Sequence, residues 1–593
     1  MDPAQASFIN AQSNRLFSVY HQADTGSGTQ KPVLICSPWG WDDVASYRPR
    51  RAWAQRLAAA GRSTLRFDLP GTGDSGGSPR DPGLVAAWVD AVRAAADSLR
   101  ERTGAEEISI LGLGLGGLLA IAAIEAGAAA SELITVAAPA SGRAFVRGAR
   151  NFSRLQGWHA EDSTVTVPEG WIEASGFLLS AETIAELEAL EPSGPWPSLR
   201  RVLMLSRRAS GRNALAEAME AAGIEVTSEG TSGWAKMVLH PETSRLAEDA
   251  AEKVAAWLEQ GGAPLPPETA PAGSAPGVDE PGQAAVQLDA SPFPITEVPF
   301  PVEHPFGRSF GLLATPAEGT TARLCLVFLN AGAVRNTGPN RMWLERARAW
   351  AARGVPTLRV DLEAIGEAGG DPEGVPPGEE FFAPKYQAQL GRVLDALEAR
   401  GLGPDFALVG LCSGGFLAFR TALADPRVRA AYVINAGALV WRDGIFDERE
   451  ARKVSRVFER KWVGKLLRGE IEWSKVKSMF ASIGERTRER LRPRHGGGRP
   501  WDEQLQLDLD RLQEQETHLT LMFCGNEGMA DELEAVDFRR TLDTRKFVEM
   551  VELPGVDHTL RPLESQAALR AILDERLERE LEARGWAPPV ESA

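Results

Sequence analysis

Hydrophobic residues follow two alternating patterns along the chain. Short apolar runs of strand length alternate with longer stretches whose apolar residues recur every three or four positions, as in an amphipathic helix. Strands that alternate with helices favour an α/β fold, in which helices cover both faces of a mainly parallel sheet. The predicted strands are residues 32–36, 64–68, 108–111, 133–138 and 201–206, then 324–330, 357–361, 406–410, 430–436, 518–524 and 547–554. Shorter β-prone stretches precede both sets, at residues 16–21 and 308–315, and predict an antiparallel start of each sheet.

The two halves of the chain repeat one another. LRFDLPGTGDSGG (residues 65–77) and ISILGLGLGGLLA (108–120) correspond to LRVDLEAIGEAGG (358–370) and FALVGLCSGGFLA (406–418). An amphipathic stretch separates the members of each pair, and the spacing is nearly the same in both halves. Two segments that match in order and spacing indicate a tandem duplication.

A stretch rich in Pro, Gly and Ala, residues 261–285, lies between the halves and is predicted to be a linker. We therefore expect one domain at residues 1–260 and another at residues 286–593. Within the second, residues 441–515 carry more basic than acidic side chains and predict a helical lid insertion. This insertion is either an ordinary solvated cap or a positive surface that steers an anionic handle, such as phosphopantetheine or coenzyme A.

Composition limits the possible classes of function. A chain of 593 residues is too long for one ordinary core, and 43% hydrophobic with 25% charged residues is typical of a soluble globular protein. A net charge of −16 disfavours nucleic acid as a partner. Four cysteines without a CxxC pair favour a reducing compartment. No apolar run approaches the roughly 20 residues that span a bilayer, and the N-terminus lacks a secretion signal, so we expect no membrane partner and a cytoplasmic location.

Residues 406–419, FALVGLCSGGFLAF, carry the strongest chemical signal. An apolar strand meets a turn of small residues, and helical spacing resumes immediately afterwards. This is the G-x-nucleophile-x-G arrangement of a nucleophile elbow, in which a reactive side chain stands on a tight turn. In this register the tip is Cys412, because a Ser413 nucleophile would put Leu411 where the turn needs a small residue.

Both halves resemble the α/β-hydrolase superfamily. The first resembles hydrolases associated with exosortase A systems through CSPWG and RFDLPGTGDSGG. The second resembles tandem hydrolase-like proteins of bacterial biosynthetic clusters through NAGAVRNTGPNR and GLCSGG, and its cysteine elbow is similar to that of dienelactone hydrolase. The resemblance implies a nucleophile, an acid and a histidine in that chain order.

The second half can supply these groups. Glu527 follows the strand at residues 518–524, with Asp531 as the alternative acid, and His558 follows the last strand. A thiol of pKa about 8.5 needs a base, so His558 would take the proton of Cys412 while Glu527 orients the imidazole. The expected oxyanion donors are the backbone N–H groups of Ser413 and of Ala331 or Gly332.

The first half departs from this pattern. Gly114 stands where the nucleophile belongs, no carboxylate follows the strand at residues 201–206, and His240 aligns poorly. We therefore predict a catalytically silent domain that packs against the second half, completes its pocket or binds part of the substrate. GLGLGG also fits a dinucleotide fingerprint, but it follows the third buried strand and the next strand ends without an acid, so we expect no nucleotide. No residue spacing suggests a metal, and we expect no cofactor.

Three functions compete. The first is a thiol-dependent acyl-transfer enzyme acting on a small ester, thioester or lactone, free or bound to a carrier protein or coenzyme A, with a biosynthetic role suggested by resemblance alone. The second is a non-covalent isomerase or cyclase in which His558 is the general base. The third is a non-catalytic binding scaffold.

Overall fold

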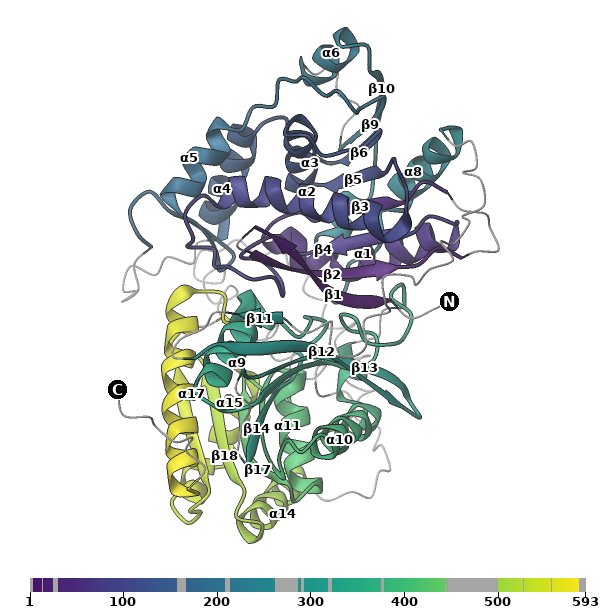
Figure 1. Ribbon diagram of the computed structural model, residues 1–593. Helices are drawn as coiled ribbons and strands as arrows, with labels where there is room; N and C mark the ends of the chain where they lie inside the picture. Colours follow the sequence, from purple (N-terminus) through teal and green to yellow (C-terminus); the bar gives the residue numbers. More distant parts are fainter. Residues whose placement is uncertain are drawn as a thin grey trace, which may run out of the picture.

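The structure is a computed structural model in which the chain folds into two α/β domains, one above the other in Figure 1. It describes residues 4–12, 14–24, 30–156, 167–207, 214–261, 286–288, 293–317, 323–374, 378–442, 445, 500–525, 527–555 and 557–585. In these parts of the chain, no helix is both long and apolar enough to span a bilayer.

The first domain is built on an eight-stranded sheet of order β1-β2-β4-β3-β5-β6-β9-β10. β2 pairs antiparallel with β1 and β4, and the other neighbours are parallel. The strands are β1 (Gln5–Ala11), β2 (Asn14–His21), β3 (Val33–Cys36), β4 (Thr64–Phe67), β5 (Ser109–Leu113), β6 (Glu132–Val136), β9 (Arg201–Ser206) and β10 (Glu225–Gly230), with a separate hairpin of β7 (Ile172–Ala174) and β8 (Phe177–Leu179).

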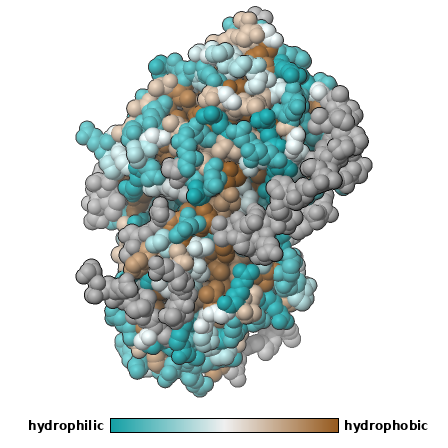
Figure 2. Space-filling view, in the orientation of Figure 1, coloured by the Kyte–Doolittle hydropathy of each residue, from teal (hydrophilic) through white to brown (hydrophobic). Residues whose placement is uncertain are grey.

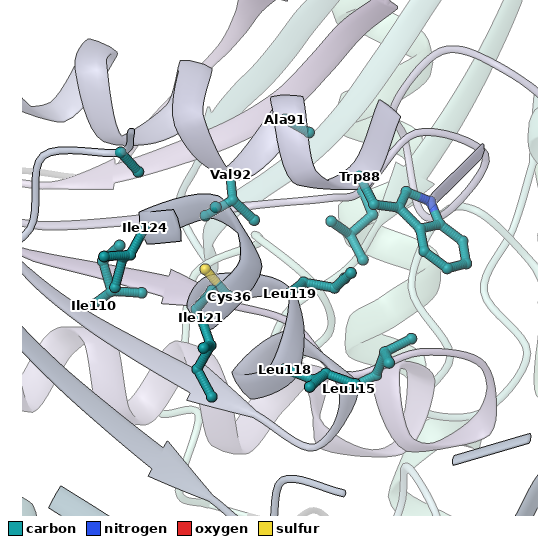
Figure 3. Packing of buried hydrophobic residues seen from close by; sticks show 14 of the residues in the cluster. Cys36, Trp88, Ala91, Val92, Ile110, Leu115, Leu118, Leu119, Ile121 and Ile124 are labelled. Atoms are coloured by element: carbon teal, nitrogen blue, oxygen red, sulfur yellow. The ribbon is translucent and has the colours of Figure 1, made fainter. Parts of the chain in front are cut away.

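Helices cover both faces of this sheet. They are α1 (Trp41–Ala59), α2 (Leu84–Thr103), α3 (Leu115–Glu125), α4 (Gly142–Gln156), α5 (Ala181–Ala189), α6 (Ala214–Ala221), α7 (Trp234–Met237) and α8 (Glu248–Gln260). On one face, Trp88 and Val92 of α2 pack with Leu119 and Ile121 of α3 over Ile110 of β5 (Figure 3). α1 and α8 pack on the opposite face. The central strands are buried on both sides, which explains their continuous apolar runs.

The second domain repeats this plan with a nine-stranded sheet of order β11-β12-β13-β15-β14-β16-β17-β18-β19. Its strands are β11 (Val286–Leu288), β12 (Ile295–His304), β13 (Gly307–Pro316), β14 (Leu324–Phe328), β15 (Thr357–Asp361), β16 (Asp405–Leu411), β17 (Val428–Ile434), β18 (His518–Cys524) and β19 (Val548–Leu553). Its α-helices are α9 (Met342–Ala352), α10 (Pro384–Ala399), α11 (Ser413–Ala424), α14 (Trp501–Glu514), α15 (Gly528–Ala535), α16 (Phe538–Leu542) and α17 (Leu563–Ala583).

The predicted fold class is confirmed, and every predicted strand is present within a few residues of its expected bounds. Of the described strands, those that the sequence did not predict are the hairpin of β7 and β8 and four strands at or beside the edges of the two large sheets: β1, β10, β11 and β12. Both β1 and β10 are largely exposed or half-buried, so their residues need not form the apolar runs that reveal a central strand.

Most of the predicted lid and linker lies outside the described residues, because positions 443–444, 446–499 and 262–285 are not described. The described end of the predicted lid is α14. Its Leu505, Leu509 and Leu512 are fully buried in the second domain's core, next to α11 and β18. This helix therefore belongs to the layer that covers the sheet.

The two duplicated segments face each other where the domains meet. Arg66 of the first segment contacts Glu367 of the second, with Nη2 lying 2.8 Å from Oε1. The equivalent residues, Arg359 and Asp74, form the reciprocal ion pair. All four side chains are buried. The contact therefore has the arrangement of an isologous dimer interface, in which the same surface is used twice.

Further contacts surround these reciprocal pairs. Arg335 binds Asp68 at 2.9 Å and Asp74 at 3.1 Å from across the junction. The rings of Phe17 and Phe310, from the equivalent strands β2 and β13, lie 6.4 Å apart. Figure 2 shows hydrophobic residues gathered near the middle of this face, where the two domains meet.

Candidate active site

The turn between β16 and α11 has the geometry of a nucleophile elbow. Cys412 adopts φ 58° and ψ −117°, a strained conformation for a residue with a side chain. A Cβ added to Gly410 would collide with Gly414, and one added to Gly414 would collide with the Asn330 carbonyl oxygen. Ser413 begins the helix, buried, so Cys412 stands at the tip of the turn, as the sequence predicted.

The structure brings Cys412, His558 and Glu527 together. Nδ1 of His558 lies 3.0 Å from each carboxylate oxygen of Glu527, and the imidazole also interacts with Cys412. Glu527 immediately precedes α15, just beyond the end of β18. The alternative acid Asp531 lies on the exposed side of α15, and Glu527 is the carboxylate that contacts His558.

Glu527 and Cys412 both favour the protonated form of His558. Burial alone would lower its pKa. The hydrogen bonds with Cys412 and Glu527, together with the attraction of both groups for the charged ring, outweigh burial and raise the pKa of His558 to about 10. The ring keeps 40% of its exposure, so it remains accessible from solvent.

Asn435, at the end of β17, holds the histidine loop and was not found from the sequence. Its Nδ2 donates to the carbonyl oxygen of His558 at 2.9 Å, and its Oδ1 accepts from the Cys524 N–H at 2.8 Å. A polar residue just after a buried strand was the only available signal. On the other side of His558, Asp557 accepts hydrogen bonds from the Arg561 N–H at 2.8 Å and from the Thr559 hydroxyl at 3.0 Å, which shapes the loop.

The predicted oxyanion loop lies against the elbow. The Gly332 N–H donates to Ser413 Oγ at 3.0 Å. In this conformation, the N–H of Gly332 is therefore paired with the Ser413 hydroxyl. The Ser413 N–H, in the first turn of α11, has no partner within its helix and suits an oxyanion. Ala331 is bridged to Val334, and Asn330 holds the loop through a 2.8 Å hydrogen bond from its Nδ2 to Asp361.

The first domain keeps the elbow without its chemistry. Gly114 has φ 53° and ψ −126°, close to the values at Cys412. A Cβ on Gly114 would lie 3.1 Å from Pro38 and 3.5 Å from the indole of Trp234. Trp234 thus fills the space in front of the turn, while the ring of His240 lies 5.9 Å from that of Trp41. None of the described residues forms a triad in this domain.

Comparison with known families matches residues 26–288 and 326–572 to the alpha/beta hydrolase family. The fold and these matches define the class: the protein belongs to the α/β-hydrolase family. No curated protein matches the chain. Within the described residues, no group of three or more His, Cys, Asp or Glu side chains is placed to hold a metal ion.

Solved structures match the chain at low identity and low TM-score. DcsB in complex with its substrate analogue is 14% identical with a TM-score of 0.32, and the match covers 43% of this chain and 98% of that chain. Est1E from Butyrivibrio proteoclasticus with ferulic acid bound is 15% identical, with a TM-score of 0.30 and coverage of 43% and 96%. The bottromycin epimerase BotH in complex with bottromycin A2 is 19% identical, with a TM-score of 0.29 and coverage of 43% and 99%.

Proposed function

We propose that the second domain is a thiol-dependent acyl-transfer enzyme with Cys412 as nucleophile, His558 as acid and base, and Glu527 as the group that orients the imidazole. One observation carries the proposal: His558 bridges Cys412 and Glu527, and both raise its pKa to about 10. Transfer of the thiol proton to His558 generates the thiolate, the reactive form of cysteine.

In the first half-reaction, the sulfur of Cys412 forms a bond to the carbonyl carbon of an ester, thioester or lactone, and the π electrons move to oxygen. The Ser413 N–H stabilises the oxyanion. The tetrahedral intermediate then collapses, the bond to the leaving group breaks, and His558 gives that group its proton. An acyl-cysteine remains.

In the second half-reaction, water or another acceptor gives a proton to His558 and attacks the acyl carbon. Collapse releases the product and the sulfur of Cys412, with the proton on His558 available to it, which restores the starting state. Glu527 keeps Nδ1 of His558 occupied throughout, so Nε2 is the nitrogen that exchanges protons with the reacting groups. The resemblance to biosynthetic-cluster hydrolases extends the proposal to specialised acyl metabolites, free or bound to a carrier protein or coenzyme A.

Intact-mass measurement after incubation with activated acyl thioesters and nitrophenyl esters tests the proposal. We expect one acyl group on the wild type and none on Cys412→Ala. Turnover that survives in Cys412→Ala but is lost in His558→Ala would instead establish non-covalent base chemistry. Absence of both an adduct and turnover across the substrate panel would favour a binding scaffold.

A further inference from the structure

A loop of the first domain reaches the elbow of the second. It follows α7 and contains Glu242. A Cβ added to Gly332 would collide with Oε1 of Glu242, so this carboxylate lies directly against Gly332. The Gly332 N–H in turn contacts Ser413, the neighbour of Cys412. A carboxylate from the silent domain therefore stands beside the predicted oxyanion loop of the other.

The loop is fastened on both sides. Arg48 donates to the carbonyl oxygens of Pro241 at 3.3 Å and Ser244 at 2.8 Å, and also to that of Gly374 in the second domain at 3.1 Å. The indole Nε1–H of Trp41 donates to the Leu239 carbonyl oxygen at 3.1 Å. These contacts hold the backbone that carries Glu242 against the second domain.

The second domain also approaches this loop from the histidine side. The guanidinium of Arg561 lies 5.5 Å from the centre of the Trp41 ring. Arg561 also binds Asp557, the residue before His558. The position of Glu242 is thus tied to the loop that carries the proposed base.

The Glu242 carboxylate is half-buried and has no hydrogen-bond or ion-pair partner among the residues that the structure describes. An unneutralised negative charge here opposes the oxyanion that forms when a thiolate attacks a carbonyl, because like charges at short range repel. A cation on the acyl group would remove this repulsion and pair with Glu242 as the charge develops.

We infer that the two domains form one composite active site, in which Glu242 of the first domain selects acyl substrates bearing a protonated amine near the reacting carbonyl. The class of substrate is an aminoacyl ester or thioester. This inference rests on the acyl-transfer function proposed above for Cys412. It gives the silent domain a role in specificity, separate from any role in stability.

Charged thiol reagents test, without any substrate, whether the negative charge of Glu242 acts at Cys412. Cationic 2-aminoethyl methanethiosulfonate and anionic 2-sulfonatoethyl methanethiosulfonate both form a disulfide with the thiolate and release methanesulfinate. The ratio of their rates at Cys412, followed by intact mass, reports the charge that the sulfur experiences. Glu242→Gln keeps the side-chain shape and should lower the cation-to-anion ratio several-fold. Glu220→Gln, an exposed position on α6, removes the same charge elsewhere and should leave the ratio unchanged.

Paired substrates test the selectivity. Nitrophenyl esters of β-alanine and of butyric acid have the same chain length and differ in the ammonium group. Glu242→Gln should reduce kcat/KM for the β-alanyl ester by about 10- to 100-fold, the range for hydrogen bonds to charged groups. It should raise kcat/KM for the butyryl ester, because the repulsion of the oxyanion is removed.

An unchanged reagent ratio, or equal losses for both esters, would overturn the role of Glu242 while acylation of Cys412 still supports the proposed function. Failure of both esters to acylate Cys412 would remove the proposed function and this inference with it. A normal unfolding curve for Glu242→Gln shows that the comparison is made on folded protein.

Discussion

Cys412 differs from the other three thiols, all of which lie in described parts of the chain. Cys36, Cys325 and Cys524 are buried, whereas Cys412 is partly exposed. Burial raises the pKa of Cys325 to about 12 and that of Cys524 to about 11, and it raises the pKa of Cys36 as well. Cys412 is therefore the thiol that a reagent in solution can reach.

Native labelling follows from this contrast. At pH 6.5 an ordinary thiol of pKa about 8.5 is only about 1% thiolate. Iodoacetamide should nevertheless add one group, at Cys412, because His558 is placed to accept the thiol proton. His558→Ala should slow the reaction roughly 10-fold or more. The thiol of His558→Ala should ionise by itself as pH rises through about 8.5, so the rate advantage of the wild type should shrink there. Peptide mass mapping identifies the site, and labelling of a buried thiol at the same rate would contradict the assignment.

Asn435 should matter to stability and to reactivity together. Asn435→Ala removes the donor to the His558 carbonyl and leaves the buried Cys524 N–H unpaired, at a cost of about 1–3 kcal/mol. Asn435→Asp keeps the acceptor for Cys524 but loses the donor to His558 and adds a carboxyl group at a fully buried site, so it should be at least as damaging as Asn435→Ala. Urea unfolding and the labelling rate of Cys412 measure the effects of both substitutions. Wild-type labelling in Asn435→Ala would mean that the loop is positioned without this residue.

At the scale of elements, the same strand-turn-helix unit occurs twice, with Gly114 at the tip of the first turn and Cys412 at the tip of the second. The backbone angles at Gly114 and Cys412 nearly coincide, yet Trp234 and Pro38 occupy the space in front of the first turn. The elbow is thus also a structural junction between sheet and helix, and it persists where no nucleophile is present.

Gly114→Ser should therefore create no hydrolase activity. The new side chain would meet Pro38, and a positive φ costs a non-glycine residue roughly 1–2 kcal/mol, so a lower melting temperature is expected. The assay belongs in a Cys412→Ala background, where any ester hydrolysis is new. Gly148→Ser on α4, where a Cβ meets no atom, is the matched control and should leave stability nearly unchanged. A gain of esterase activity in Gly114→Ser would show that the first domain retains usable partners.

At the scale of the whole molecule, buried charges join the duplicated halves. Glu367 accepts hydrogen bonds from Arg66 at 2.8 Å and from the Tyr47 hydroxyl at 2.6 Å. Burial alone would raise its pKa, but Arg66, Arg51 and His21 outweigh burial and lower it to about 2. Such a pair is costly to break, because removing one partner leaves the other charge buried and unpaired.

Glu367→Gln should destabilise the protein by about 3–5 kcal/mol at neutral pH. Glu373→Gln is the control: it breaks an exposed pair with Arg56 across the same junction and should cost about 0–1 kcal/mol. Since the folded pKa of Glu367 is lowered, its contribution is complete above about 4.5 and is lost as pH falls toward about 2. The difference in free energy of unfolding between wild type and Glu367→Gln, measured with urea, should therefore shrink as pH falls from about 4.5 to about 2. A stability difference that does not change with pH would show that the carboxylate charge of Glu367 is not its cause.

Local sequence patterns were sufficient for the two α/β domains, the duplication and the elbow with Cys412 at its tip. Periodicity and small residues act within a few positions, so adjacent residues carry that information. His558 and Glu527 could be proposed from chain order, although the choice between Glu527 and Asp531 required coordinates. The edge strands β1, β10 and β11 were missed, because a half-exposed strand need not be apolar, whereas the edge strand β19 was predicted.

Other features depended on the folded chain. Asn435 meets His558 across 123 positions, and Arg66 meets Glu367 across 301. The approach of Glu242 to Gly332 likewise depends on how the two domains pack. Such contacts depend on strand order and on the docking of one domain against the other, and no local pattern in the chain encodes either, because they are set by the burial of surfaces far apart in sequence.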